Sequence, residues 1–392
     1  MDTIILKIYG PSKFKIKHLD WFLPELSCRT YADLSPTEQK SQRIYLRHFV
    51  LHPPYQDRYV PKVEIFETLG KDRKSVIYIL KTEFSVPKLL FGNSLQEAGE
   101  VHKSKIISAL KQAFLRIGIQ IEEKEIADAR LAAFHICKNV PLPHDIRMQE
   151  ALTELKRVDI SKVVDVTEKE EKNGGRWVHI YSGNVERVFY DKIADAMRPK
   201  NKRKDKGKID FERSVVEKFG LQRREVFRYE YRVKKTQTVA REINHALGRE
   251  PKTTVAFKDL FSKDLIKMLL LKSWRDLIQR PENQLALLGP KDDLAMLQHM
   301  LSQAKVESNA HCLNKALTSY GLACTIRNHG AKEVKRTVFT AINEDHSERL
   351  TKKIQKSAEL AKGIPFSNTI AYIDRNLESF ELIDWNLLEN GL

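Results

Sequence analysis

The chain has 392 residues, and its 68 Lys and Arg side chains outnumber its 52 Asp and Glu side chains to give a net charge of +16. With 42% hydrophobic and 31% charged residues, the composition is that of a folded globular protein and excludes collagen-like and low-complexity chains. The length predicts two or three domains, each large enough to bury a core.

Cysteine content and hydropathy narrow the class of protein further. The four cysteines are too few and too scattered for a disulfide framework, and no C-x-x-C pair is present for a zinc or redox site. The first residues do not resemble a signal peptide, and no apolar run approaches the roughly 20 residues of a membrane span. We therefore expect a cytoplasmic protein without membrane segments, whose positive charge favours an anionic partner.

The first two thirds of the chain have the pattern of an antiparallel sheet with helices. Alternating apolar residues predict strands over residues 3–9, 63–67, 75–80, 82–86, 129–136, 163–166, 176–181, 186–190 and 225–233. A helical period predicts helices over 94–117 and 144–157. These elements favour an α+β layer fold with an antiparallel central sheet. Their order also suggests a duplicated half, although no repeat is convincing at the residue level.

The last third is predicted to be helical. Helical periods cover residues 236–247, 256–280, 290–305, 309–320, 331–342 and 345–361. We expect a domain boundary near 248, with a catalytic domain over 1–248 and an all-helical domain over 249–392. The apolar stripe of 257–280 is expected to be core. Two helices flanking residues 321–330 would suit a helix-turn-helix DNA reader, or else a segment that packs on the first domain or dimerises.

Common nucleotide-binding and hydrolase motifs are absent from the sequence. It contains no Walker A motif, G-x-G-x-x-G, H-E-x-x-H or G-x-S-x-G. The sequence therefore lacks the motifs that would usually identify an ATPase, a dehydrogenase, a zinc protease or a serine hydrolase.

Polar residues placed on or after apolar strands suggest chemistry on a phosphodiester. Glu83, His135 and Glu230 lie on different predicted strands, and carboxylates with an imidazole suit Mg²⁺ or Mn²⁺. Tyr190 ends a strand, and a positioned tyrosyl oxygen can form a covalent intermediate. Lys192 would stabilise the phenolate or neutralise phosphate.

Each of these residues also has a purely structural interpretation. Tyr190 is equally suited to packing at the end of a strand. His135, between Phe134 and Ile136, fits a hydrogen-bonded, semi-buried histidine. Glu230 lies between two arginines two residues away on either side, and so fits a salt-bridge partner within the sheet.

A strongly basic run follows Tyr190. Residues 198–208 hold seven basic side chains against the single acid Asp205: Arg198, Lys200, Lys202, Arg203, Lys204, Lys206 and Lys208. Such a run is either a solvated loop or a grip on a nucleic-acid backbone.

Three segments, taken in order, resemble a family of replication proteins. TEFSVPKLLFGN, RVFYDK and FRYEYRVK resemble the phage and plasmid replication proteins related to the filamentous-phage gene-two initiator. More distantly, they resemble the plasmid Rep-trans initiators of the HUH-like relaxase superfamily. The resemblance covers roughly residues 1–245, and it implies an HUH-endonuclease-like fold for this part of the chain.

The resemblance also implies roles for individual residues. Tyr190 matches the family's nucleophile and Lys192 its basic neighbour, while Glu230 matches the metal ligand of the R-x-E pattern that begins at Arg228. Glu83 matches the ligand of the upstream strand. Arg228 and the basic run are expected to contact DNA.

One position departs from the family pattern. Where relatives often carry Arg, a hydrophobic residue and Asp, this chain has Arg130, Leu131 and Ala132. Either His135 supplies the missing ligand or the metal site is weakened, and we favour His135.

The resemblance implies a rolling-circle replication initiator with a phage or plasmid origin, acting in the bacterial cytoplasm. Such an enzyme nicks one strand of a single-stranded or hairpin DNA origin, forms a 5′-phosphotyrosyl bond with the help of Mg²⁺ or Mn²⁺, and rejoins the strand. A host helicase and polymerase would be its partners, since the chain lacks a P-loop. The alternative is a non-catalytic DNA-binding regulator of replication or transcription. A third class, an RNA-binding or membrane-surface protein, is favoured only by charge.

Overall fold

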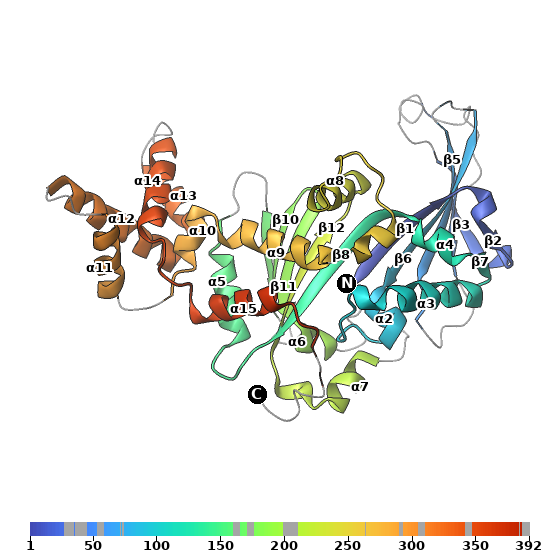
Figure 1. The fold of residues 1–392 in the computed structure, drawn as a ribbon, viewed down its shortest axis with the longest axis horizontal. Helices are drawn as coiled ribbons and strands as arrows, with labels where there is room; N and C mark the ends of the chain where they lie inside the picture. Colours follow the sequence, from blue (N-terminus) through green and yellow to red (C-terminus); the bar gives the residue numbers. More distant parts are fainter. Residues whose placement is uncertain are drawn as a thin grey trace.

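The structure is a computed structural model of the chain. It describes residues 1–26, 35, 45–52, 59–70, 72, 74–159, 165–170, 176–198, 211–262, 264–289, 293–304, 310–341, 347–383 and 385. Within these residues the fold is α+β, with a large antiparallel sheet and a helical carboxyl-terminal region, as the sequence predicts (Figure 1).

Ten of the described strands form one sheet in the order β3-β4-β5-β6-β1-β8-β12-β11-β10-β9, and every neighbouring pair is antiparallel. The strands are β1 (Thr3–Tyr9), β3 (Phe22–Leu26), β4 (Tyr45–Leu51), β5 (Lys62–Leu69), β6 (Val76–Ser85), β8 (Arg130–Pro141), β9 (Asp165–Glu170), β10 (Arg176–Ser182), β11 (Val185–Asp191) and β12 (Val226–Val233). A second, two-stranded sheet joins β2 (Phe14–Ile16) to β7 (Ile119–Ile121).

The strand order is symmetric about the central pair of β1 and β8. Outward from this pair, β6, β5, β4 and β3 on one side correspond to β12, β11, β10 and β9 on the other. In each half the innermost flanking strand comes last in the chain and leads into a helix: α2 (Val86–Phe91) after β6, and α8 (Thr236–Ala246) after β12. The two halves therefore share one topology, which supports the duplication that the order of elements suggests.

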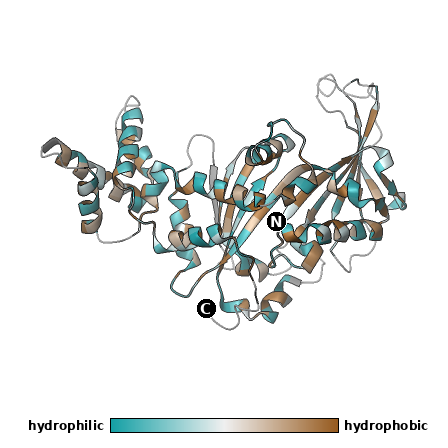
Figure 2. Cartoon of the chain, in the orientation of Figure 1, coloured by the Kyte–Doolittle hydropathy of each residue, from teal (hydrophilic) through white to brown (hydrophobic). Residues whose placement is uncertain are grey.

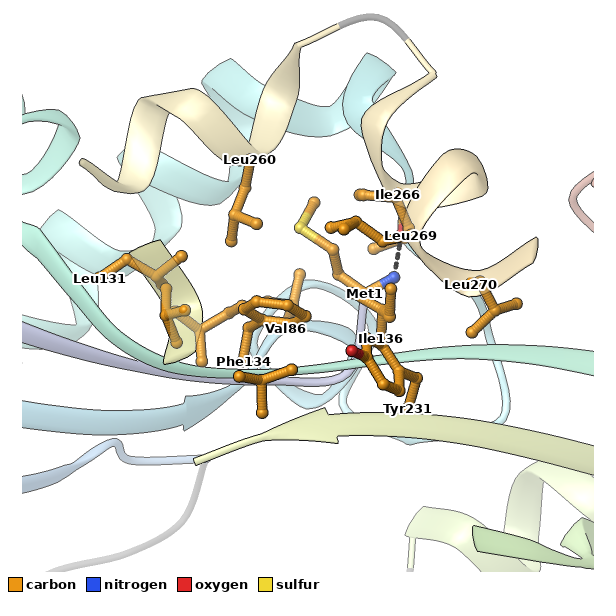
Figure 3. Close-up of a cluster of buried hydrophobic side chains, with 14 of the residues drawn as sticks. Met1, Val86, Leu131, Phe134, Ile136, Tyr231, Leu260, Ile266, Leu269 and Leu270 are labelled. Atoms are coloured by element: carbon orange, nitrogen blue, oxygen red, sulfur yellow. Dashed lines mark hydrogen bonds between the residues drawn. The ribbon is translucent and has the colours of Figure 1, made fainter. Parts of the chain in front are cut away.

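One face of the sheet carries the main core. Because side chains alternate along a strand, Ile4, Leu6 and Phe134 point to the same face as Phe189 and Tyr229, and all five are fully buried. The alternation of hydrophobic and hydrophilic residues along the strands is visible in Figure 2. Figure 3 shows Met1, Phe134 and Tyr231 packed beneath Leu260 and Leu269.

Helices cover this apolar face. Residues of α3 (Lys103–Arg116), α5 (Met148–Lys156), α8, α9 (Leu265–Ile278) and α15 (Asn368–Ser379) belong to the same core cluster as the strands. The apolar stripe predicted over 257–280 is therefore core, as expected: Leu265, Leu269 and Trp274 are buried. Its helix begins only at Leu265, because Asp264 has a φ of 58° that interrupts the turn.

The opposite face of the sheet is polar. It carries Glu83, His135, Tyr190 and Glu230, which alternate with the core residues of their strands. The short helices α6 (Lys192–Ala196) and α7 (Phe211–Lys218) pack with Leu95 and Trp385 in a small separate cluster at the start of β12.

A second core lies in the carboxyl-terminal helices at one end of the molecule, far from β3–β5 (Figure 1). It joins α10 (Pro281–Ala286), α11 (Asp293–Gln303), α12 (Ala310–His329), α13 (Ala331–Ala341) and α14 (Ser347–Leu360). Residues after the boundary expected near 248 thus contribute to both cores, since α9 and α15 pack on the sheet. The remaining described helix, α4 (Glu123–Ala127), lies between β7 and β8.

Two predicted helices differ from the structure for local reasons. The helix expected from residue 94 begins at Lys103, because the Asn93 side chain accepts hydrogen bonds from the Leu95 and Gln96 N–H groups in a turn. The break expected over 321–330 is absent, because α12 continues through Gly321 to His329 with Ala323 and Ile326 buried. The predicted helix-turn-helix spacing is therefore wrong.

Among the described residues, no helix has the length and apolar character that crossing a membrane requires.

Candidate functional site

Tyr190 lies near the end of β11, on the polar face of the sheet. It is opposite Arg228 of β12 in the strand register and is partly buried. Its hydroxyl donates a hydrogen bond to Oε1 of Glu230, at 2.5 Å. The sequence thus places a candidate nucleophile and a carboxylate on neighbouring strands, and the fold brings them into contact.

The two arginines beside Glu230 in the sequence also bind it. Arg228, Glu230 and Arg232 alternate along β12 and therefore share its polar face. The Arg228 Nε lies 2.9 Å from Oε1 of Glu230, and the Arg232 Nε donates to Oε2 at 2.8 Å, with a second contact from Arg232 Nη2. The salt-bridge role considered for Glu230 is therefore present, together with its contact to Tyr190.

Arg228 is fixed in place by further partners. It is only 1% exposed, and its guanidinium donates to the Ser94 carbonyl oxygen at 2.8 Å and contacts Cys137 Sγ at 3.1 Å. It also forms an ion pair with Asp2, at 3.2 Å. The structure thus places Arg228 beneath the site, as a support for Glu230.

The charges around Tyr190 set its protonation. Burial opposes ionisation of Glu230, but Arg232 and Arg228 outweigh it and hold the pKa of Glu230 well below its usual range. Burial raises the pKa of the Tyr190 phenol well above its ordinary value; the Arg228 charge opposes this shift, and the Glu230 carboxylate adds to it. At neutral pH the phenol is therefore protonated and donates to an ionised carboxylate.

His135 lies opposite Arg232 on the neighbouring strand β8. Burial and the Arg232 charge lower the pKa of His135, while the carboxylates of Asp2, Glu230 and Glu83 act in the opposite direction. The imidazole is therefore neutral at pH 7, the form that can bind a metal ion. Asp2 is an acid that the strand patterns did not single out, because it precedes β1.

Three predicted residues, His135, Glu83 and Lys192, make no contact with Tyr190 in the described part of the chain. His135 is opposite Arg232 on one side of β12, whereas Tyr190 is opposite Arg228 on the other side. Glu83 shares the polar face but lies on β6, separated from β12 by β1 and β8, or about 14 Å at ~4.8 Å per strand. The Lys192 ammonium is buried and binds Ser94 Oγ at 2.6 Å and Asp195 at 3.5 Å.

The basic run is described only at its first residue. Arg198 lies with its guanidinium 5.1 Å from the centroid of the Trp177 ring and pairs with Asp195. The other six members, Lys200, Lys202, Arg203, Lys204, Lys206 and Lys208, lie outside the described residues.

The predicted metal ligands do not converge in this arrangement. No group of three or more His, Cys, Asp or Glu side chains able to hold an ion is found in the described part of the chain. Both carboxylate oxygens of Glu230 are already bound by arginines, so an ion would have to compete with them. The residues as arranged do not fit a divalent cation, and the requirement for Mg²⁺ or Mn²⁺ stays a prediction from the resemblance.

Comparison with known proteins adds no further constraint, because no family model, curated protein or solved structure matches this chain.

Proposed function

We propose that this chain nicks and rejoins one strand of DNA through Tyr190 and initiates rolling-circle replication. The observation that carries the proposal is the 2.5 Å hydrogen bond from Tyr190 to Glu230, set among arginines on the polar face of the sheet. A nucleophile, an acceptor for its proton and a partly exposed cation for a phosphate, here Arg232, are components that such a transfer needs.

The geometry favours a specific order of proton transfer. The Tyr190 oxygen attacks the phosphorus, the 3′ oxygen of the nicked strand leaves, and a 5′-phosphotyrosyl bond replaces the phosphodiester. Because the pKa of Tyr190 is raised, a standing phenolate is disfavoured, so the phenol proton leaves through Glu230 only as the oxygen attacks. Glu230, whose pKa is held low by its arginines, passes this proton on to the departing 3′ oxygen, which leaves as a hydroxyl. The exchange of one phosphodiester for another allows rejoining without ATP.

The resemblance in sequence supports the same reaction class by analogy. A large antiparallel sheet with a tyrosine at the end of one strand is compatible with an HUH-like nicking enzyme. By this analogy, the substrate is the single-stranded or hairpin DNA of an origin, the setting is a bacterial cytoplasm, and a host helicase and polymerase are partners. The alternative is a non-catalytic DNA-binding regulator.

The experiment is a covalent-adduct assay. The protein is mixed with Mn²⁺ and a supercoiled plasmid carrying its own genomic neighbourhood, then denatured and compared with Tyr190→Phe. We expect a DNA-linked band from the wild type alone, because phenylalanine removes only the attacking oxygen. Tight DNA binding without an adduct from either protein would favour the regulator.

A further inference from the structure

Strand β10 places three aromatic side chains in a row on the polar face of the sheet. Trp177, His179 and Tyr181 alternate with Val178 and Ile180, which are fully buried on the opposite face. In the strand register Trp177 is directly opposite Tyr190, so the row starts beside the candidate nucleophile. We call these three residues the β10 aromatic row.

The rings of the β10 aromatic row are partly accessible to solvent, whereas the other face of the same strand packs on the core. All three side chains are partly exposed, while α5 packs on the other face of β10. The Arg198 guanidinium lies over the Trp177 ring, and the His179 and Tyr181 rings lie 5.3 Å apart. Exposed rings next to cations are the features that bind unpaired bases and their phosphates.

The other half of the sheet repeats this arrangement. Strand β4 corresponds to β10 in the symmetric strand order, and it carries Tyr45 and His48 on the polar face. There His48 stacks on Phe66 of β5 with ring centroids 4.3 Å apart, and the Lys81 ammonium lies 5.9 Å from the same ring. Aromatic rings next to a cation thus occur in both halves.

The ion pairs beneath the rings also correspond. His48 forms an ion pair with Glu64. Glu64 in turn pairs with Lys81, the residue directly opposite it on β6. In the second half His179 pairs with Glu186, which pairs with Arg232 in the same relation.

The candidate nucleophile Tyr190 and its partner Glu230 have no equivalents in the first half of the sheet. Applying this register, Tyr190 falls at the position of Thr68 and Glu230 at that of Ile79. The candidate nucleophile and its carboxylate are therefore confined to one half. The aromatic rings and ion pairs that both halves share therefore have a role other than the attack on phosphorus.

We propose that the β10 aromatic row, with Arg198, is a stacking platform for unpaired bases of single-stranded DNA, and that Tyr45, His48 and Phe66 form a second such platform. The proposal rests on the proposed function only in taking the bound strand to be the one that Tyr190 attacks. Duplex DNA is not the ligand, because its base faces are covered by their neighbours in the stack.

The test is binding of a fluorescent oligothymidylate of about 4 nucleotides, at the short end of the usual span of single-strand sites and too short to cross the six strand spacings between β5 and β10. Trp177→Ala should weaken this binding roughly 5- to 150-fold, since stacking contributes about 1–3 kcal/mol per base. Trp177→Phe keeps a ring and should bind within a few fold of the wild type. Unchanged circular dichroism of both variants controls for folding, and affinity for a duplex of equal length should not change.

The second platform is tested with a longer strand. Phe66→Ala should weaken binding of an oligothymidylate of about 30 nucleotides more than binding of the short one, because only the long strand reaches both halves. Wild-type affinity of Trp177→Ala for the short strand would overturn the first platform. Equal losses for the two lengths, or none, in Phe66→Ala would overturn the second.

These outcomes are separable from those for the nicking reaction. If the wild type forms no covalent adduct but Trp177→Ala binds the short strand more weakly, the proposed nicking reaction is rejected and the stacking platform is retained. An adduct formed by a protein whose Trp177→Ala variant binds normally would do the opposite.

Discussion

Glu230 and Glu83 are acids on the same face of the sheet with different surroundings. Glu230 accepts from Tyr190 and from Arg232, whereas Glu83 lies across two intervening strands. The contrast separates two accounts of the site. If Glu230 positions the phenol and takes its proton, Glu83 is dispensable, but if both bind an ion, the loss of either is severe.

We therefore predict that Glu230→Gln lowers the rate of adduct formation by about 10²–10⁴-fold, the usual contribution of a proton-transfer group. Glu83→Gln should stay within a few fold of the wild type. The measurement is adduct formation over a range of Mn²⁺ concentrations, with DNA affinity as the control. Equal losses in the two variants, both relieved by high Mn²⁺, would instead favour an ion shared by the two carboxylates.

Asp191, next to the candidate nucleophile, caps helix α6 and is expected to titrate near neutrality. Its carboxylate accepts from the Ile193 and Ala194 N–H groups, yet burial raises the pKa of Asp191 to about 6. Because the pKa of Asp191 is higher in the folded state than in the unfolded state, the folded protein is more stable when Asp191 is protonated than when it is ionised. The contribution of Asp191 is then complete below its ordinary pKa near 4 and is lost as the pH rises through about 6.

Asp191→Asn keeps a capping oxygen but does not titrate. We predict that the free energy of unfolding of this variant, relative to the wild type, rises by on the order of 2 kcal/mol when the pH is raised from 4.5 to 7.5. Urea unfolding at the two pH values measures the change, and other titrating groups cancel because both proteins share them. A difference that does not vary with pH would show an ordinary pKa for Asp191.

At the scale of elements, Gly330 joins two helices at a point where only glycine fits. It separates α12 from α13 with a φ of 82°, and a Cβ there would lie 3.0 Å from the Arg157 carbonyl oxygen. Gly321, inside α12, has open space around its Cα. The two glycines therefore provide a matched pair of substitutions.

We predict that Gly330→Ala lowers the free energy of unfolding by about 2–3 kcal/mol, because it combines a left-handed backbone with a close contact. Gly321→Ala should raise it by about 0.5–1 kcal/mol, since alanine favours a helix. Denaturant unfolding followed by circular dichroism measures both. A stable Gly330→Ala protein would show that the joint between the helices rearranges freely.

The elements that sequence patterns predicted well are those with a clear period. Strands β10, β11 and β12 were expected to within one residue at each end, because alternation follows directly from a sheet with one buried face, whereas β8 runs five residues beyond its expected end. The start of α3 was misplaced, since the turn at Asn93 depends on side-chain hydrogen bonds. The continuity of α12 through Gly321 depends on burial in a bundle that no local pattern reveals.

The site was predictable in part for the same reason. The alternation of Arg228, Glu230 and Arg232 on β12 is visible in the sequence, and so is Tyr190 at a strand end. The contribution of Asp2 was not, because it reaches Arg228 only through the pairing of β1 with β8. The distance between Glu83 and Glu230 likewise follows from strand order, which the sequence alone does not specify.

At the scale of the whole molecule, the net charge of +16 favours binding to a polyanion. We predict that neutralising Lys202, Arg203 and Lys204 together reduces the slope of log affinity against log salt by about 2 for a single strand, if each lysine or arginine contacts one phosphate. Binding at several salt concentrations measures the slope. An unchanged slope would exclude this segment from the DNA interface.

The central claim is that Tyr190 forms a covalent bond with DNA. The most direct measurement is mass spectrometry of the peptide that contains residue 190, after reaction with plasmid DNA and Mn²⁺ and digestion of both polymers. We predict a nucleotide linked to Tyr190 in the wild type and an unmodified peptide in Tyr190→Phe. A nucleotide on another residue, or an adduct that persists in Tyr190→Phe, would contradict it.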